Sequence, residues 1–177
     1  MKIHSSIRSL LLAGVALAAT VTITGTPAQA QEAKLIGRFG DWEAYTRGGK
    51  DDRFCYIVSK PTEASLRSRR GDIFLLIWHR PAKKEFDVVQ VDSGYAYKKE
   101  TEVELKIGGD EWNLFTRDSN AWTYRGDDDA NIVQAMRKGA RLTVKGTSSR
   151  NNPTTDSYSL KGVSAAHRAM SKACGRS

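Results

Sequence analysis

Short segments in which apolar and polar residues alternate recur along most of the chain. Asp41–Thr46 alternates in this way, and Phe54–Val58 is rich in aromatic and β-branched side chains, so both segments predict strands. Gly108–Asp110 supplies a tight hairpin turn between two further alternating segments. Strands of the same kind are expected at residues 86–91, 103–107, 112–116, 121–124, 142–145 and 154–160. Short strands separated by turn residues are typical of an all-β sandwich.

The segment Ile73–Trp78 is the most apolar run after the N-terminal region. Pro81 follows closely and ends it, and an apolar run this short predicts a strand that is buried on both faces. This strand and the alternating segments together define an expected core. The side chains expected in this core are Ile73, Leu75, Ile77, Trp78, Val89, Leu105, Trp112, Leu114, Leu142 and Val144.

Two segments have helical rather than strand periodicity. The first is a short helix that Asp127 or Asp128 can cap at its N-terminus, and Gly139 marks its end. Its expected buried side consists of Ile132, Val133 and Met136. The second helix is expected to dock on the sandwich through a face formed by Val163, Ala166, Met170 and Ala173. The sequence thus predicts an all-β sandwich with two short helices, and residues 31–177 contain no linker that would divide this single domain.

Residues 1–30 have the pattern of a secretory signal peptide. A basic start precedes an apolar run from Leu10 to Ile23, and Ala28 and Ala30 occupy the small positions of a cleavage site. The alternative is an uncleaved membrane anchor, but the run is shorter than the ~20 apolar residues that a spanning helix needs. We therefore expect cleavage before Gln31 and export to the periplasm or the outer surface.

The charge of the chain is basic but mixed. Its formal net charge is +8, and removal of Lys2 and Arg8 with the signal peptide leaves +6. Acidic residues are interspersed with the basic ones, so a basic tail of the nucleic-acid-binding kind is excluded. The densest basic cluster is Arg67, Arg69 and Arg70, in an expected exposed loop. These residues are candidates for binding an anionic partner, and an ordinary solvated surface is the competing interpretation.

Cys55 and Cys174 are the only cysteines, and both lie in the exported part. Export places them in an oxidising compartment, where an even pair usually forms a disulfide. Docking of the second helix would bring Cys174 toward the strand that contains Cys55. A frayed C-terminus, with Cys174 free or paired between chains, is the alternative. Two cysteines alone cannot complete a tetrahedral metal site.

Catalytic chemistry has little support in the sequence. Once the leader is removed, His79 and His167 are the only histidines, and neither a G-x-S-x-G nor an H-E-x-x-H motif is present. A histidine at a strand end is most often structural or exposed. We therefore expect no enzymatic activity and no catalytic, cofactor-binding or metal-binding residues. An enzyme that uses His79 is the alternative, and a pocket that pairs His79 with a carboxylate would be its sign.

Five stretches carry a resemblance to a known family. They are Phe39–Trp42, Cys55–Tyr56, Met136–Gly139, Thr143–Ser148 and Thr154–Gly162. With these stretches the chain resembles the invasion-associated locus B family of exported proteobacterial proteins. The resemblance implies an immunoglobulin-like β-sandwich in the cell envelope, a role in bacterial entry into host cells such as erythrocytes, and no enzymatic activity. It also implies a protein partner or an envelope or host-surface component, and peripheral contact with the outer membrane remains open.

Overall fold

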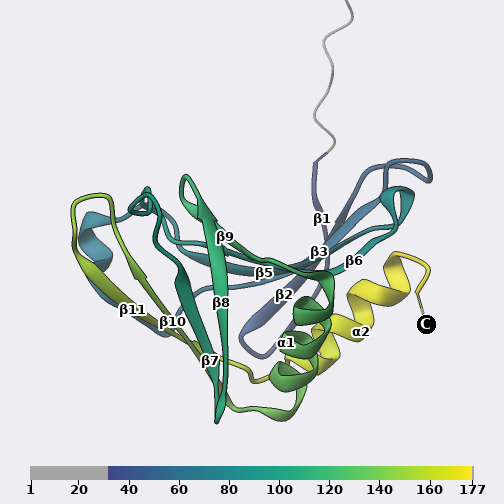
Figure 1. The fold of residues 1–177 in the computed structure, drawn as a ribbon. Helices are drawn as coiled ribbons and strands as arrows, with labels where there is room; N and C mark the ends of the chain where they lie inside the picture. Colours follow the sequence, from purple (N-terminus) through teal and green to yellow (C-terminus); the bar gives the residue numbers. More distant parts are fainter. Residues whose placement is uncertain (1–31, 177) are drawn as a thin grey trace, which may run out of the picture. The chain divides into compact units, whose positions relative to one another are not determined.

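The computed structural model describes residues 32–176, which contain eleven β-strands and two α-helices (Figure 1). The predicted signal peptide, residues 1–30, lies outside the described residues. The strands are β1 (Lys34–Phe39), β2 (Trp42–Arg47), β3 (Phe54–Ser59), β4 (Glu63–Ala64), β5 (Phe74–Arg80), β6 (Glu85–Asp92), β7 (Val103–Ile107), β8 (Asp110–Arg117), β9 (Asn120–Thr123), β10 (Arg141–Thr147) and β11 (Pro153–Ser159). The helices are α1 (Gly126–Lys138) and α2 (Val163–Ala173), and two 3-10 turns span Arg67–Arg69 and Pro81–Lys83.

All eleven strands belong to one antiparallel sheet, in the order β1-β2-β3-β5-β6-β9-β8-β7-β10-β11-β4. The chain passes directly from β3 to β4, although these strands are far apart in the sheet order, so the sheet folds over on itself. Trp42 in β2 donates a hydrogen bond from its indole Nε1 to the carbonyl oxygen of Ser159 in β11, at 3.0 Å. The all-β prediction with two helices is confirmed, and the two layers of the sandwich are parts of one hydrogen-bonded sheet.

Strand β5 corrects one expectation. Leu75 and Ile77 are fully buried, whereas Phe74, Leu76 and Trp78 on the other face are only half-buried. Because only the inner face of β5 meets the core, the prediction of burial on both faces was wrong. The outer face is covered only by neighbouring side chains on the sheet surface, as where Trp78 lies 5.4 Å from the Phe54 ring centre.

Most of the expected core is buried. The buried members are Ile73, Leu75, Ile77, Val89, Leu105, Leu114, Leu142 and Val144, whereas Trp78 and Trp112 are half-buried. The buried set lines the inner faces of both layers, so each strand contributes side chains at alternate positions. The alternation seen in the sequence therefore located the core correctly, except for Trp78 on the outer face of β5 and Trp112 in β8.

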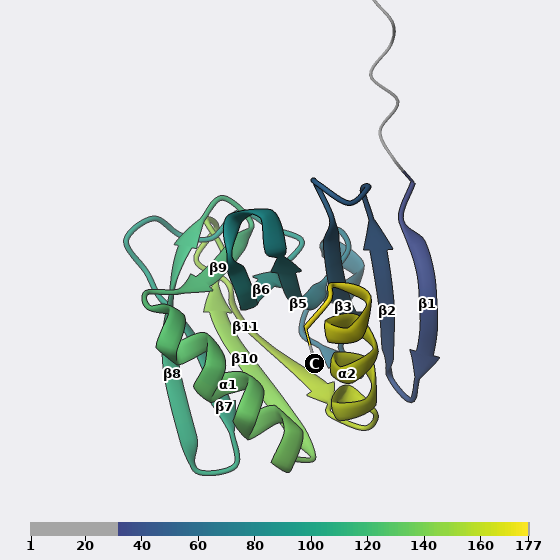
Figure 2. The same ribbon diagram turned by 90° about the vertical axis from the view of Figure 1, so that its right-hand side faces the viewer.

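The two helices lie next to each other, with α2 packed against β1–β3 and α1 against β6 and β9 (Figures 1 and 2). Helix α1 buries Ile132, Val133 and Met136, as expected. The predicted aspartate cap was wrong: Arg125 precedes the helix, and no side chain caps it. The helix begins at Gly126, so the three aspartates lie in its first turn, where the helix dipole favours negative charge.

Helix α2 is held at both ends. Gly162, just before it, has φ +95°, and a Cβ at this position would collide with the Phe39 carbonyl, so only glycine fits. At the other end, a disulfide joins Cys174 to Cys55 in β3, with a Cα–Cα distance of 6.0 Å. Helix α2 buries Val163, Ala166 and Met170. The structure thus contains the disulfide expected from the sequence. No helix in residues 32–176 has the length and apolar character needed to span a membrane.

Replacing Leu75 by alanine is expected to lower the free energy of unfolding by about 2–5 kcal/mol. Leu75 is fully buried at the centre of the folded sheet, so its loss leaves a cavity. Leu76→Ala, on the half-buried outer face of the same strand, is the matched control and should cost less. Urea denaturation followed by circular dichroism measures both values. Equal losses for the two variants would contradict the assignment of the core to the inner face.

Candidate functional site

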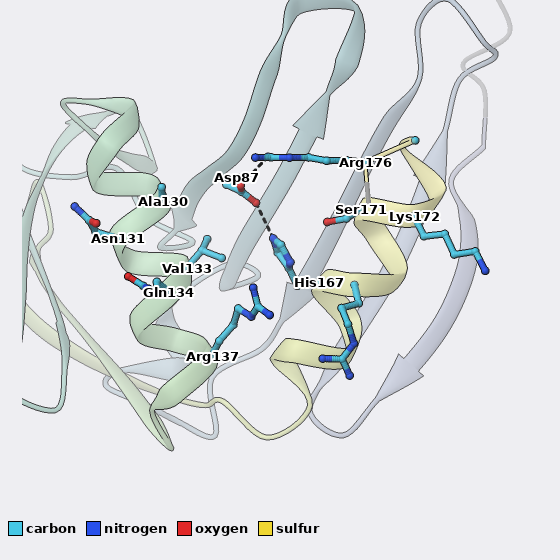
Figure 3. Close-up of a pocket in the computed structure, with 12 residues that line it drawn as sticks. Asp87, Ala130, Asn131, Val133, Gln134, Arg137, His167, Ser171, Lys172 and Arg176 are labelled. Atoms are coloured by element: carbon cyan, nitrogen blue, oxygen red, sulfur yellow. Dashed lines mark hydrogen bonds and ion pairs between the residues drawn. The ribbon is translucent and has the colours of Figure 1, made fainter.

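A groove with a volume of about 1000 Å³ lies between α1 and α2 (Figure 3). One wall comes from α1, the other from α2 and the residues that follow it, and β6 contributes Asp87. The C-terminus of α1 lies near the start of α2. The hydrogen bond from the Ser164 hydroxyl to the Arg137 carbonyl oxygen, at 3.5 Å, joins these two helix ends. The helices therefore run antiparallel along the groove. Its lining residues are Asp87, Ala130, Asn131, Val133, Gln134, Arg137, His167, Arg168, Ser171, Lys172, Gly175 and Arg176.

Asp87 is the acceptor that holds the upper part of this groove together. Its Oδ1 accepts a hydrogen bond from Nε2 of His167 at 2.6 Å, and its Oδ2 accepts one from Nη1 of Arg176 at 2.8 Å. Burial by itself would raise the pKa of Asp87, but the hydrogen bond from His167 and the charge of Arg176 outweigh it, and the pKa is lowered. Asp87 is therefore ionised and fully paired.

His79 lies beneath this pair on the inner face of β5 and is completely buried. Its Nδ1 accepts a hydrogen bond from the backbone N–H of Asp87 at 2.9 Å, and its Nε2 lies 3.1 Å from Oγ of Ser171. Because Nδ1 accepts, a neutral His79 must carry its proton on Nε2 and donate it to Ser171. Burial lowers the pKa of His79 to about 4. His79 is thus a neutral residue that connects β5, β6 and α2.

A pocket that pairs His79 with a carboxylate was the expected sign of an enzyme. The structure brings His79 close to a carboxylate, but without the hydrogen bonds that catalysis needs. Nε2 of His79 lies 3.8 Å from Oδ1 of Asp87. In a Ser-His-Asp triad, however, the nitrogen that faces the serine must be free to accept its proton, and the other nitrogen donates to the carboxylate. Both roles are reversed in His79, because Nε2 carries the proton and Nδ1 accepts from the backbone. Ser171 is therefore not activated as a nucleophile.

The same hydrogen bonds argue against a metal centre. His79, Asp87 and His167 bring potential ligand atoms within 4.8 Å of one another. A histidine that binds a metal through one nitrogen normally donates its other N–H to an acceptor. The other nitrogen of His79 faces the N–H of Asp87, which is a donor, and Arg176 already occupies the carboxylate. The three residues are accordingly better suited to a hydrogen-bond network than to metal ligation.

The rim of the groove is cationic. Arg137 from α1 and Arg168 and Lys172 from α2 are exposed, and none of them has an ion-pair partner within residues 32–176. Figure 3 shows the Arg137 side chain reaching from α1 into the groove toward His167. Asp87 is the only acidic residue in the lining, and it is already paired. An unneutralised positive charge therefore remains along the groove.

The arginine cluster predicted from the sequence does not act as one surface. Arg67 and Arg69 are exposed on a 3-10 turn, but the Arg70 side chain is only 2% exposed. The Arg70 guanidinium makes two hydrogen bonds of 2.6 Å to the buried carboxylate of Asp156. Arg70 is consequently unavailable to an external anion, and its expected binding role is corrected to a structural one. The disulfide residues Cys55 and Cys174 lie where the sequence placed them.

Sequence analysis missed Asp87, Ser171 and Arg176. Their partners are 80 to 92 residues away in the chain, so no local motif connects them. One signal was present. His79 lies two residues after Ile77 and four after Leu75, so it points to the same buried face of β5. A buried histidine needs a hydrogen-bond partner.

Acid is expected to destabilise the protein through His79. Its folded pKa is about 4, whereas an unfolded histidine titrates near pH 6.5, so the unfolded chain binds the extra proton between these values. The contribution of His79 to stability should therefore fall as the pH drops from about 6.5 toward 4, by up to about 3 kcal/mol. Asp129, whose pKa burial raises to about 6, acts in the opposite direction, so the His79 contribution is measured as the difference in pH dependence between the wild type and His79→Gln, by urea denaturation at pH 7.5 and 4.5. An unchanged pH dependence in that variant would show that His79 is not held neutral.

The comparison with protein families decides the family of this chain. A family model described as "Invasion associated locus B (IalB) protein" matches residues 42–171. The chain belongs to this family. Among solved structures, the IalB-family chain is similar to the "Crystal structure of invasion associated protein b from bartonella henselae", with a TM-score of 0.56 and 17% sequence identity. That likeness covers 77% of this chain and 95% of the other, and it shows a shared fold. No curated protein matches the sequence.

Proposed function

We propose that this IalB-family protein is an exported, non-enzymatic binding protein of the bacterial envelope that contributes to contact with host cells such as erythrocytes. The family match over residues 42–171 is the observation that carries the proposal. The leader pattern of residues 1–30 supports export. A disulfide within the folded part is typical of proteins that fold in an oxidising compartment.

The hydrogen bonds around His79 support a non-enzymatic role. Among the described residues, the cluster of His79, Asp87, His167 and Ser171 most resembles a catalytic site. Its hydrogen bonds place the His79 proton on Nε2, which suits a structural role and not a general base. The cluster joins α2 to β5 and β6 and so fixes one wall of the inter-helix groove. A groove with one fixed wall and cations on both helices is suited to binding.

The proposal is tested in the source bacterium. We expect fractionation to recover the protein from the periplasm or the outer surface with an N-terminus at Gln31, as read by N-terminal sequencing. Deletion of the gene should reduce adhesion to or entry into erythrocytes, and complementation should restore it. The matched control is complementation with a chain that lacks residues 1–30, which should fail. A cytoplasmic location, or an exported form that retains Leu10–Val21, would contradict the proposal.

Binding of anionic glycans or lipid head groups is the second candidate function. The basic groove between α1 and α2 favours it, since its rim carries cations without partners in residues 32–176. Arg67 and Arg69 remain exposed candidates as well, although Arg70 does not. The two locations make different predictions, which matched variants can separate.

A further inference from the structure

We propose that the groove between α1 and α2 binds the phosphomonoester head group of an anionic membrane lipid. The proposal deepens the binding role above, on which it rests, by naming a ligand class and a site. It depends on the charge, the shape and the hydrogen-bonding groups of the groove walls.

Charge favours a ligand with more than one negative charge. Arg137, Arg168 and Lys172 approach the groove from two helices and have no acidic partner among residues 32–176. A carboxylate would carry only one charge, whereas a phosphate monoester carries about −1.5 to −2 near neutral pH. Guanidinium groups also match the oxygen geometry of phosphate through paired hydrogen bonds. Cations on both helices that line the groove are thus better complemented by a phosphate than by a carboxylate.

The fixed part of the site separates this groove from an ordinary basic surface. Asp87 holds His167 and Arg176 in place on one wall, and the buried His79 holds Ser171. Because both oxygens of Asp87 are engaged, its carboxylate does not neutralise the three rim cations. A phosphate that enters the groove therefore meets one wall, that of α2, whose position is already fixed.

Shape and composition favour a head group over a peptide. Ala130 and Val133 are the only apolar side chains in the lining, apart from the aliphatic parts of longer residues. An amphipathic partner helix would need several apolar anchors at helical spacing, which this groove does not provide. Both walls are helices whose internal backbone groups are paired, so an extended peptide would find no free strand edge. A head group needs neither, because charged side chains such as Arg137, which reaches into the groove, can bind its polar atoms.

The volume also suits this ligand. At about 1000 Å³ the groove is much larger than a single phosphate and lies at the upper end of the size range of small-molecule sites. It can hold a phosphorylated glycerol or sugar unit. Ala130 and Val133 are too few to cover an acyl chain, so we assign the ligand to a lipid whose chains remain in the membrane.

The test measures co-sedimentation of the purified, disulfide-bonded protein with lipid vesicles. We expect binding to vesicles of phosphatidic acid in phosphatidylcholine and none to phosphatidylcholine alone. The triple variant Arg137→Gln, Arg168→Gln, Lys172→Gln should lose affinity by about ten-fold or more, because it removes several charge-assisted hydrogen bonds. If that variant does not fold, as judged by near-ultraviolet circular dichroism, Arg137→Gln alone should still weaken binding by several-fold, because Arg137 reaches into the groove.

The matched control removes the same charge elsewhere. Arg67, Arg69 and Arg150 are exposed, and their replacement by glutamine should change the affinity by less than about two-fold. Equal losses in the two triple variants would overturn the site, because they would indicate attraction by net charge alone. Glycerol 3-phosphate that binds as tightly as the vesicles would overturn the lipid assignment. Absence of vesicle binding would overturn the lipid-binding inference. It would not contradict export or the host-cell role, which fractionation and gene deletion test separately.

Discussion

Replacing Arg70 by methionine is expected to lower the free energy of unfolding by about 3–5 kcal/mol, because it strands the Asp156 carboxylate in the interior. The Arg70 and Asp156 side chains are 2% and 3% exposed. Two hydrogen bonds of 2.6 Å join the guanidinium to the two carboxylate oxygens. Water cannot replace the lost partner at such low exposure, so the charge of Asp156 would remain uncompensated.

The Arg70 guanidinium also connects segments that are distant in the sequence. Its Nε donates to the carbonyl oxygen of Ser93, just after β6, and Nη1 donates to that of Ser65, just after β4, at 2.9 and 3.0 Å. The guanidinium lies 4.8 Å from the centre of the Tyr95 ring. Arg70 therefore joins the loop between β4 and β5 to β11 and to the end of β6. Its loss should destabilise both layers of the sheet.

Urea denaturation measures this prediction, with Arg69→Met as the matched control. Arg69 is exposed one position away and should change stability by no more than about 0.5 kcal/mol. The double variant Arg70→Met, Asp156→Leu should lose less than Arg70→Met alone, because it removes the stranded charge. A loss below about 1 kcal/mol in the single variant would mean that the pair is hydrated in solution.

The fold was predictable from the sequence because its strands follow local alternation. Leu142 and Val144, for example, are buried at alternate positions of β10, as their pattern predicted. The outer face of β5 was not predictable in this way. An apolar run is equally compatible with a core on both sides and with one core face and a surface of mutually covering side chains such as Trp78 and Phe54.

The candidate site was hidden from the sequence because its contacts depend on how distant segments pack. Asp87 has a φ of +59°, next to an irregular pairing between β5 and β6, and this geometry places its backbone N–H against His79. Alternation along a strand cannot predict such a bend. Arg70 was misread for the same reason, since its partner Asp156 lies 86 residues away and neither residue is unusual in its local sequence.

Loss of the Cys55–Cys174 disulfide is expected to lower the free energy of unfolding by roughly 4–5 kcal/mol at most. The two cysteines are separated by 119 residues, so the bond restricts a long loop of the unfolded chain. Strain in the folded state and residual structure in the unfolded chain reduce the effect. The prediction compares the oxidised protein with Cys55→Ser, Cys174→Ser by urea denaturation.

The reduced wild-type protein is the control for this variant, because it lacks the bond but keeps both sulfur atoms. Reduced wild type and the double serine variant should have similar stability if the cross-link, rather than packing of the sulfurs, provides most of the effect. The bond also fixes the end of α2, where Arg53 donates from Nη1 to the Ala173 carbonyl oxygen at 3.1 Å. Reduction should therefore loosen the Asp87–Arg176 contact and weaken the binding of any ligand in the groove.

Non-reducing mass spectrometry of protein from the bacterium tests whether the Cys55–Cys174 bond forms in the cell. Two free thiols or a disulfide-linked dimer would contradict the intramolecular bond.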